Sequence, residues 1–172
     1  MSDKTAAAIV DANRQWLIEH RKTYLSSGGV RGHITDISHV RGHAFTTNCL
    51  IKYRGRKSGK TYVTPLIYGD IGGEVVVVGS RGGADRHPVW YLNILACTEL
   101  EFQIATEAFR ATWREPAGAE RDKVWAFMVD IYPAYAEYQR ATPRQIPLVM
   151  MKAIAPAEVF KESDVTGQDR FA

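Results

Sequence analysis

Two pairs of short β-type segments, each joined by a tight turn, restrict the folds open to this chain. Residues 46–53 and 62–68 flank a short connection that contains two glycines, and residues 100–104 and 109–113 alternate apolar and polar side chains around a turn near Thr106. Both patterns predict β-hairpins. Because hairpins make neighbouring strands antiparallel, they disfavour a doubly wound parallel sheet.

Two further segments are predicted as strands. Residues 74–79 carry four consecutive valines, the run expected of a strand buried on both faces, and residues 146–154 form a last strand. Apolar spacing and proline in a first turn predict helices around them. The predicted helical segments are 5–25, 88–95, 120–131 and a turn that carries Tyr135 and Tyr138. The fold class is therefore α+β and mainly β: a split β-barrel of about six mostly antiparallel strands with helices packed outside.

A chain of 172 residues is long enough for one domain with a sizeable core. We expect residues 1–172 to form a single domain, with the barrel core at 45–154 and a flexible tail at 156–172, whereas residues 26–45 give no clear pattern. No apolar run reaches the roughly 18 residues of a membrane span. No signal peptide is expected, and the two cysteines form no CxxC pair, so we expect reduced thiols and a cytoplasmic protein.

The turn of the first hairpin is strongly basic. Residues 52–61 contain five basic side chains and no acid. Gly55 and Gly59 allow a tight turn whose amides can point at an anion, and arginine adds forked donors that match phosphate or carboxylate oxygens. The turn is therefore either an anion cradle or a solvated hairpin tip.

Two other classes of anion-binding protein do not fit this turn. A P-loop has four residues between its glycines and opens a helix, whereas Gly55 and Gly59 enclose three residues and precede a predicted strand. A nucleic-acid partner is not expected, because the basic cluster is short and the net charge of the chain is only +3. Nucleotide hydrolysis and nucleic-acid binding are thus disfavoured.

A glycine-rich bend follows the valine strand and leads into a helix. Residues 79–83 form the bend, and Pro88 marks the first turn of the helix, where backbone amides lack helical partners. This arrangement predicts that Ser80 and Arg81 lie near the helix start. Trp90 and Tyr91 on the first helical turns are either part of that site or plain core residues.

Other chemistry-bearing residues are less specific. Tyr132, Tyr135 and Tyr138 recur every three residues, a spacing that suits packing but also offers ring surfaces and hydroxyl donors. The five histidines show no metal-ligand spacing, so they are expected to be structural or solvated and no metal site is predicted. No GxSxG or comparable nucleophile motif occurs.

Taken together, these stretches resemble the deazaflavin-dependent nitroreductase family, a branch of the split β-barrel flavin and deazaflavin oxidoreductases. The order and spacing match from about residue 45 to residue 152. The motifs that carry the resemblance are Gly55-Arg56-Lys57-Ser58-Gly59, Thr64-Pro65-Leu66, Gly79-Ser80-Arg81-Gly82-Gly83-Ala84, His87-Pro88-Val89-Trp90-Tyr91-Leu92-Asn93, and Tyr132 to Gln139 with Ile146-Pro147 beyond it.

The resemblance implies coenzyme F-420, an 8-hydroxy-5-deazaflavin with a phosphodiester and an oligoglutamate tail. The residues implied to hold the phosphate and tail are Arg56, Lys57, Ser58, Gly59 and Lys60. Those implied to border the ring and its ribityl chain are Thr64, Pro65, Leu66, Val78, Gly79, Ser80, Arg81, Trp90, Tyr91 and Asn93. Tyr135, Tyr138 and Ser80 would border the substrate as catalytic residues. The implied reaction is hydride transfer from the reduced deazaflavin to a hydrophobic, electron-poor quinone, enone or nitro compound.

Some residues depart from the family pattern. Ile67 stands where some nitroreductive members carry a tyrosine, Arg81 replaces a common lysine, and Tyr62 occupies a place that is often basic. Two alternatives remain at this stage: an FMN enzyme on the same barrel, and a non-catalytic carrier of the coenzyme or of a lipophile. Membrane-surface contact through residues 5–25 is possible but not expected, because that helix has mixed charges. Monomer and homodimer both remain open.

Overall fold

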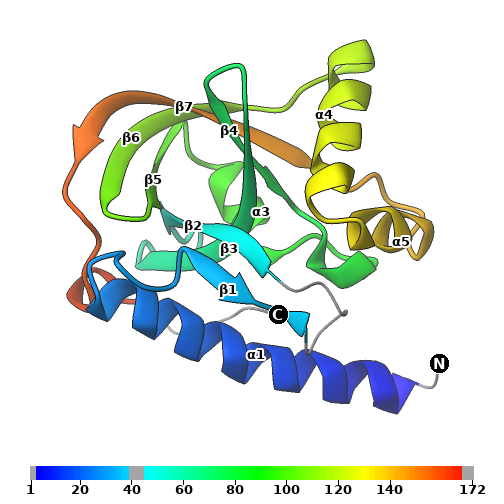
Figure 1. Ribbon diagram of the computed structural model, residues 1–172, viewed down its shortest axis with the longest axis horizontal. Helices are drawn as coiled ribbons and strands as arrows, with labels where there is room; N and C mark the ends of the chain where they lie inside the picture. The colour runs from blue at the N-terminus through cyan, green and yellow to red at the C-terminus, as the bar shows by residue number, and fades with distance from the viewer. Residues whose placement is uncertain (1–2, 39–44, 168–172) are drawn as a thin grey trace.

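The barrel predicted from the hairpins is present in the computed structural model, which describes residues 3–38 and 45–167. Seven strands in this part of the chain form one antiparallel sheet, and pairing of the second strand with the fifth closes six of them into a barrel (Figure 1). The strands are β1 Ile34–Asp36, β2 Phe45–Arg54, β3 Thr61–Ile71, β4 Glu74–Val78, β5 Glu99–Ile104, β6 Glu107–Arg114 and β7 Leu148–Ala157. The order is β1-β2-β3-β4-β7-β6-β5.

The sequence predicts about six strands, and the additional one is β1. This strand has three residues and pairs only with the start of β2, where Ile34 faces Thr47. A three-residue strand is too short to produce a readable period of two, which explains why the pattern of residues 26–45 was uninformative. The last strand begins at Leu148 rather than at residue 146.

Helices cover the barrel on two sides, and a short helix packs into its interior. The helices are α1 Asp3–Ser26, α3 Val89–Ile94, α4 Gly118–Ile131 and α5 Ala134–Arg140, with the short 3-10 turns η1 Arg81–Gly83 and η2 Glu162–Asp164. In Figure 1, α1 runs beside β1 and β3, whereas α4 and α5 lie at another side of the barrel. Of the helices in the described part of the chain, none is both long and apolar enough to cross a membrane.

Alternation of side chains along the strands divides the apolar residues into separate clusters. One face of β2 contributes Cys49 and Ile51 to the barrel interior, where Trp90 and Ile94 of α3 pack against them. The opposite face contributes Leu50 to a cluster under α1 and the C-terminal segment. The outward valines of β4 lie in a third cluster with α4 and α5. Because α3 packs into the barrel, its position is fixed by the core.

The segment after residue 156 differs from the predicted flexible tail. Phe160 is only 1% exposed, and its backbone N–H donates to Gln103 Oε1 at 2.8 Å. The Lys52 ammonium lies 4.5 Å from the centre of the Phe160 ring. Residues 158–167 therefore pack on the barrel, anchored by one aromatic side chain that local sequence statistics do not distinguish from a surface residue. The remainder of the expected tail, 168–172, lies outside the described residues.

Replacing Phe160 by alanine tests this packing. We expect Phe160→Ala to reduce the free energy of unfolding by about 3 to 5 kcal/mol, because a buried aromatic ring leaves a cavity. Phe45, which is 65% exposed, is the matched control, and its alanine variant should lie within about 0.5 kcal/mol of wild type. Urea unfolding measures both. Equal stability of the two variants would mean that the segment does not pack in solution.

Candidate functional site

The basic turn between β2 and β3 is closed by its own backbone. The Gly55 N–H donates to the Lys60 carbonyl at 2.8 Å, and the Gly59 N–H donates to the Gly55 carbonyl at 2.8 Å. Gly59 has φ +66°, a left-handed conformation that glycine adopts without strain. The Lys60 N–H donates to Ser58 Oγ at 3.2 Å. The predicted hairpin is therefore a compact loop, and its cationic side chains extend from a defined backbone.

Asn93 of α3 holds this turn against the barrel. Its side-chain carbonyl Oδ1 accepts hydrogen bonds from the Arg56 backbone N–H at 3.2 Å and from Arg56 Nη1 at 2.9 Å. Asn93 is 4% exposed whereas Arg56 is exposed, so these bonds are partly shielded from water. The sequence predicts Asn93 as a coenzyme ligand. In the structure the Asn93 side-chain oxygen accepts hydrogen bonds from Arg56, and its contact with the coenzyme remains a prediction.

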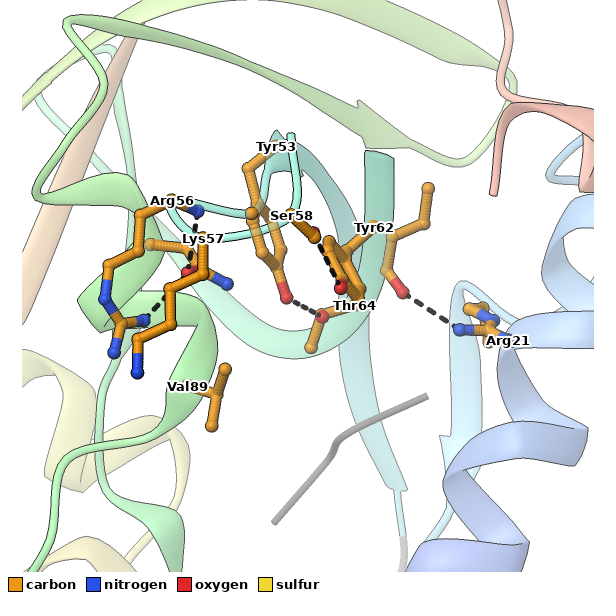
Figure 2. Close-up of a pocket in the computed structure, with 11 residues that line it drawn as sticks. Arg21, Tyr53, Arg56, Lys57, Ser58, Tyr62, Thr64 and Val89 are labelled. Carbon is orange, nitrogen blue, oxygen red and sulfur yellow. Dashed lines mark hydrogen bonds between the residues drawn. The ribbon is translucent and has the colours of Figure 1, made fainter. Parts of the chain in front are cut away.

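A cavity of about 300 Å³ lies between this turn, β3, α3 and α1 (Figure 2). Its lining residues are Arg21, Tyr53, Gly55, Arg56, Lys57, Ser58, Tyr62, Val63, Thr64, Val89 and Asn93. Three of them are cationic and none is acidic. Figure 2 shows Arg56 and Lys57 on one side of the cavity and Arg21 on the other. Its charge therefore suits an anionic ligand.

At the tip of the turn, Arg56 and Lys57 are not neutralised by a carboxylate of the described residues, whereas Lys52 at its base pairs with Glu101. The ion pairs of the described residues involve Lys52, Arg110 and Arg114, and neither Arg56 nor Lys57 forms one. Two cations held close together without a counter-charge repel each other, and this repulsion is relieved when an anion binds. The charge arrangement favours an anion cradle over a solvated tip.

Two stacked tyrosines form the aromatic wall of the cavity. Tyr53 and Tyr62 face each other across the β2–β3 pair, with ring centres 5.9 Å apart and planes inclined by 14°. The Tyr53 and Thr64 hydroxyls are hydrogen bonded at 2.8 Å. The predicted site residues omit Tyr53, although it lies in the basic segment 52–61, and Val63, which precedes the predicted Thr64. They also omit Arg21, which comes from α1 and has no local motif that marks it.

The C-terminal segment supports this wall from outside. The Thr61 N–H donates to Thr166 Oγ1 at 2.9 Å, and the Gly167 N–H donates to the Thr61 carbonyl at 2.9 Å. Gly167 lies so close to the Tyr62 ring that an added Cβ would stand 2.3 Å from it. The position of Tyr62 in the cavity therefore depends on a segment that the sequence predicts to be mobile.

The remaining predicted residues lie along β3, at the glycine bend and on α5. Thr64 faces the cavity, and Pro65 and Val78 are buried. At Gly83 an added Cβ would stand 2.8 Å from the Tyr138 carbonyl oxygen, which shows how closely α5 packs on the bend. The structure thus brings the bend and the tyrosine helix together. Trp90 and Tyr91 are 6% and 7% exposed and belong to the barrel core.

The three tyrosines form a tight cluster away from the cavity lining. Tyr135 is 4% exposed, and its ring centre lies 5.0 Å from that of Tyr132 and 6.3 Å from that of Tyr138. Burial, followed by the neighbouring tyrosines, raises the pKa of Tyr135 far above its ordinary value. Its hydroxyl is therefore neutral at physiological pH and can donate a hydrogen bond, but it cannot serve as a base. Catalytic roles for Tyr135, Tyr138 and Ser80 remain predictions.

The chain thus combines a split barrel with a cationic cavity that has no acidic lining residue. The family model described as F420H(2)-dependent quinone reductase matches residues 16–153, and the chain belongs to that family. This confirms the resemblance to deazaflavin-dependent split-barrel reductases. The family name indicates reduced F-420 as the coenzyme, and the protein is an oxidoreductase.

Individual relatives agree with this assignment. An F420H(2)-dependent quinone reductase of Mycobacterium tuberculosis is 27% identical over 140 residues, which cover 80% of this chain and 89% of the relative. A solved structure of an F420-H2 dependent reductase is 37% identical with a TM-score of 0.57, and the match covers 61% of this chain and 93% of that one. A structure described as a domain-swapped dimer is 33% identical with a TM-score of 0.60, covering 80% and 98%. Residues 154–172, including the segment against Tyr62, lie outside the family match.

The residues present fit the coenzyme. A phosphodiester and glutamate carboxylates require cationic donors and exposed amides, and the cavity offers Arg21, Arg56 and Lys57 beside a glycine-containing turn. The described residues contain no cluster of three or more side chains that could hold a metal ion.

Replacing Asn93 by alanine tests how the turn is held. We expect Asn93→Ala to accelerate hydrogen exchange of the Arg56 amide by at least about tenfold, because one hydrogen bond contributes roughly 1 kcal/mol and neighbouring bonds weaken with it. Amide exchange followed by NMR measures this, and the Gly55 amide, bonded within the turn, should change less. Unchanged protection of Arg56 would show that Asn93 does not hold the turn.

Replacing Gly167 by valine tests the support of the aromatic wall. We expect the side chain to displace the Tyr62 ring and weaken coenzyme binding by about three- to tenfold, because lost wall contacts cost roughly 1 kcal/mol. Fluorescence titration with F-420 measures this. Gly72→Val is a control outside the cavity, although its left-handed φ of +62° makes some loss of stability expected there. An affinity equal to that of wild type in Gly167→Val would contradict the role of the segment.

Proposed function

We propose that the cavity holds the anionic part of reduced F-420 and that the protein transfers the hydride to a quinone. The observation that carries the proposal is the set of three cations, Arg21, Arg56 and Lys57, around a cavity with no acidic side chain. FMN has one phosphate and no acidic tail, and it needs fewer cations. The names of the relatives support a quinone as the acceptor.

The turn binds the phosphate and glutamate tail through charge and amide donors. Arg56, whose backbone and guanidinium are oriented by Asn93, offers its remaining guanidinium N–H groups to a phosphate or carboxylate oxygen. Lys57 and Lys60 are exposed and contribute mobile charges. The Ser58 amide supplies a further donor, whereas the predicted Gly59 and Lys60 amides are hydrogen bonded within the turn. Arg21 approaches from α1 and donates to the Val63 carbonyl at 3.4 Å, so its charge faces the same cavity.

The coenzyme ring extends from the turn along β3 toward the glycine bend. Side chains two residues apart share a face of a strand, so Leu66 continues the face on which Tyr62 and Thr64 line the cavity. Thr64 and Leu66 form one border of the ring with their side chains, and Pro65, whose side chain lies on the opposite face of β3, contributes backbone only. The other border is formed by the bend residues Val78, Gly79, Ser80 and Arg81, with Trp90 and Tyr91 packed in the core beside them.

When bound, the reduced coenzyme supplies a hydride to the acceptor. The protein positions the two molecules and stabilises charge that develops on the acceptor oxygen. Ser80 Oγ and the hydroxyls of Tyr135 and Tyr138 are the donors proposed for that oxygen. We also propose that the protein works in the cytoplasm, since Cys49 and Cys97 are both free thiols.

Reversing the charge of the turn tests coenzyme binding. We expect Arg56→Glu with Lys57→Glu to weaken binding of F-420 by at least about 100-fold, because two charge-assisted contacts worth roughly 1.5 to 3 kcal/mol each become repulsive. Fluorescence titration measures the dissociation constant. Lys123→Glu with Lys152→Glu reverses two exposed lysines outside the cavity and is the matched control. Equal affinities of the two double variants would contradict the proposed site.

Turnover of wild-type protein with reduced F-420 then tests the acceptor. A quinone panel, assayed beside enones and nitroaromatics at equal concentration, should give the highest kcat/KM. Tight binding of F-420 without turnover of any acceptor would favour a carrier.

A further inference from the structure

Arg144, between α5 and β7, binds the glycine bend from one side. Its Nε donates to the Ala84 carbonyl at 2.7 Å, its Nη1 to the Gly79 carbonyl at 3.1 Å, and its Nη2 to the Ser80 carbonyl at 2.7 Å. A fourth contact joins Nη1 to His87 Nδ1 at 3.1 Å. One guanidinium therefore connects four residues of the bend and of the segment that leads into α3. No sequence motif discussed above marks Arg144 as functional.

These contacts determine where the amides of the bend point. A trans peptide places its C=O and the following N–H on opposite sides, so the Gly79 and Ser80 carbonyls that face Arg144 turn the Ser80 and Arg81 N–H groups away from it. Within the described residues, neither N–H has an assigned backbone acceptor, whereas the neighbouring Gly79 N–H donates to the Pro147 carbonyl. Two adjacent donors thus remain for another molecule.

The backbone of the bend is strained and needs this support. Arg81 has φ +47°, a left-handed conformation that is unfavourable for a non-glycine residue. Such a conformation persists only when the surrounding contacts hold it. The three carbonyl contacts of Arg144, together with the close packing of Gly83 on Tyr138, supply that restraint.

The fourth contact selects one tautomer of His87. A guanidinium only donates hydrogen bonds, so His87 Nδ1 accepts, and in the neutral ring the proton lies on Nε2. The His87 ring centre lies 5.0 Å from that of Tyr91, whose hydroxyl donates to Glu115 Oε1 at 2.8 Å. The charged groups around His87 are Arg144 and Glu115. Burial, followed by Arg144, lowers the pKa of His87, and Glu115 opposes them.

We propose that Arg144 is a positioning residue for the ring site: it fixes the 79–84 bend with the Ser80 and Arg81 amides free, and it presents His87 as an Nε2–H donor. Arg144 then controls how the coenzyme ring is oriented for hydride transfer, whereas the basic turn controls how tightly the coenzyme binds. The inference rests on the proposed function, because the ring is assigned to this bend there.

Kinetics of Arg144 variants test the proposal. We expect kcat at saturating coenzyme to fall by at least about tenfold in Arg144→Gln and in Arg144→Lys, because a displaced ring is poorly oriented and lysine cannot reach all four acceptors. The dissociation constant of F-420 should change by no more than about threefold, because the tail contacts are distant and independent. Arg121→Gln is the matched control: it loses a 2.7 Å bond to the Ile146 carbonyl in the same region without touching the bend, and it should retain kcat within about twofold.

Two kinetic results would overturn the proposal: a wild-type kcat in both Arg144 variants, or an equal loss of kcat in Arg121→Gln. A loss of affinity without loss of kcat would also overturn it, because Arg144 would then act on binding. Thermal unfolding of each variant identifies a general loss of folding, and the lysine variant keeps the charge if the glutamine variant does not fold.

Nitrogen-15 NMR of His87 gives a readout that needs no coenzyme. We expect wild type to show protonated Nε2 and unprotonated Nδ1 at neutral pH, and Arg144→Gln to show a mixture of tautomers and a higher His87 pKa, because a nearby positive charge is removed. A wild-type His87 protonated at Nδ1 would overturn the inference even if F-420 binds. Failure of wild type to bind F-420, with the tautomer as expected, would instead contradict the proposed function.

Discussion

The hydrogen bonds between Asn93 and Arg56 connect the hydrophobic core with the charged site. Asn93 lies on α3, and α3 is held in the barrel by Trp90 and Ile94, so packing in the interior determines where the Asn93 oxygen lies. That oxygen fixes both the backbone and the guanidinium of Arg56. A cationic turn held in this way loses little conformational entropy when an anion binds, because the order is provided by folding. At the proposed site, core packing would thereby contribute to coenzyme affinity without touching the coenzyme.

The two parts of the site differ in what they provide: the basic turn provides charge, and the glycine bend provides a fixed geometry. The basic turn, with Arg21 from α1 opposite it, provides charge that acts on any polyanion of suitable length. The glycine bend contains a strained residue, Arg81, and is restrained by Arg144 from the segment before β7. Charge tolerates small displacements, whereas hydride transfer depends on the geometry of a flat ring. The turn is exposed and carries exposed lysines. The bend, in contrast, packs against α5 and is hydrogen bonded by Arg144 from the segment before β7, which agrees with this difference.

Short-range patterns predicted most of the fold and the charged half of the site. The hairpins, the valine strand and the helices follow from local periodicity, and the cation-rich turn was visible as five bases in ten residues. Contacts between distant segments could not be predicted in this way. Arg21 reaches the cavity from α1, and the backbone N–H of the buried Phe160 donates to Gln103 Oε1. Arg144 donates to carbonyls about sixty residues earlier in the chain. Each depends on the closed barrel, which the local pattern of those residues does not encode.

The central claim is that charge at the turn recognises the polyanionic tail of the coenzyme. The most direct measurement compares the affinity of F-420 with that of the same deazaflavin lacking its glutamates, across a range of salt concentrations. The account predicts that the shortened form binds at least about tenfold more weakly at low salt and that its affinity depends less on salt, because fewer ion contacts are screened. Equal affinities with equal salt dependence would contradict it.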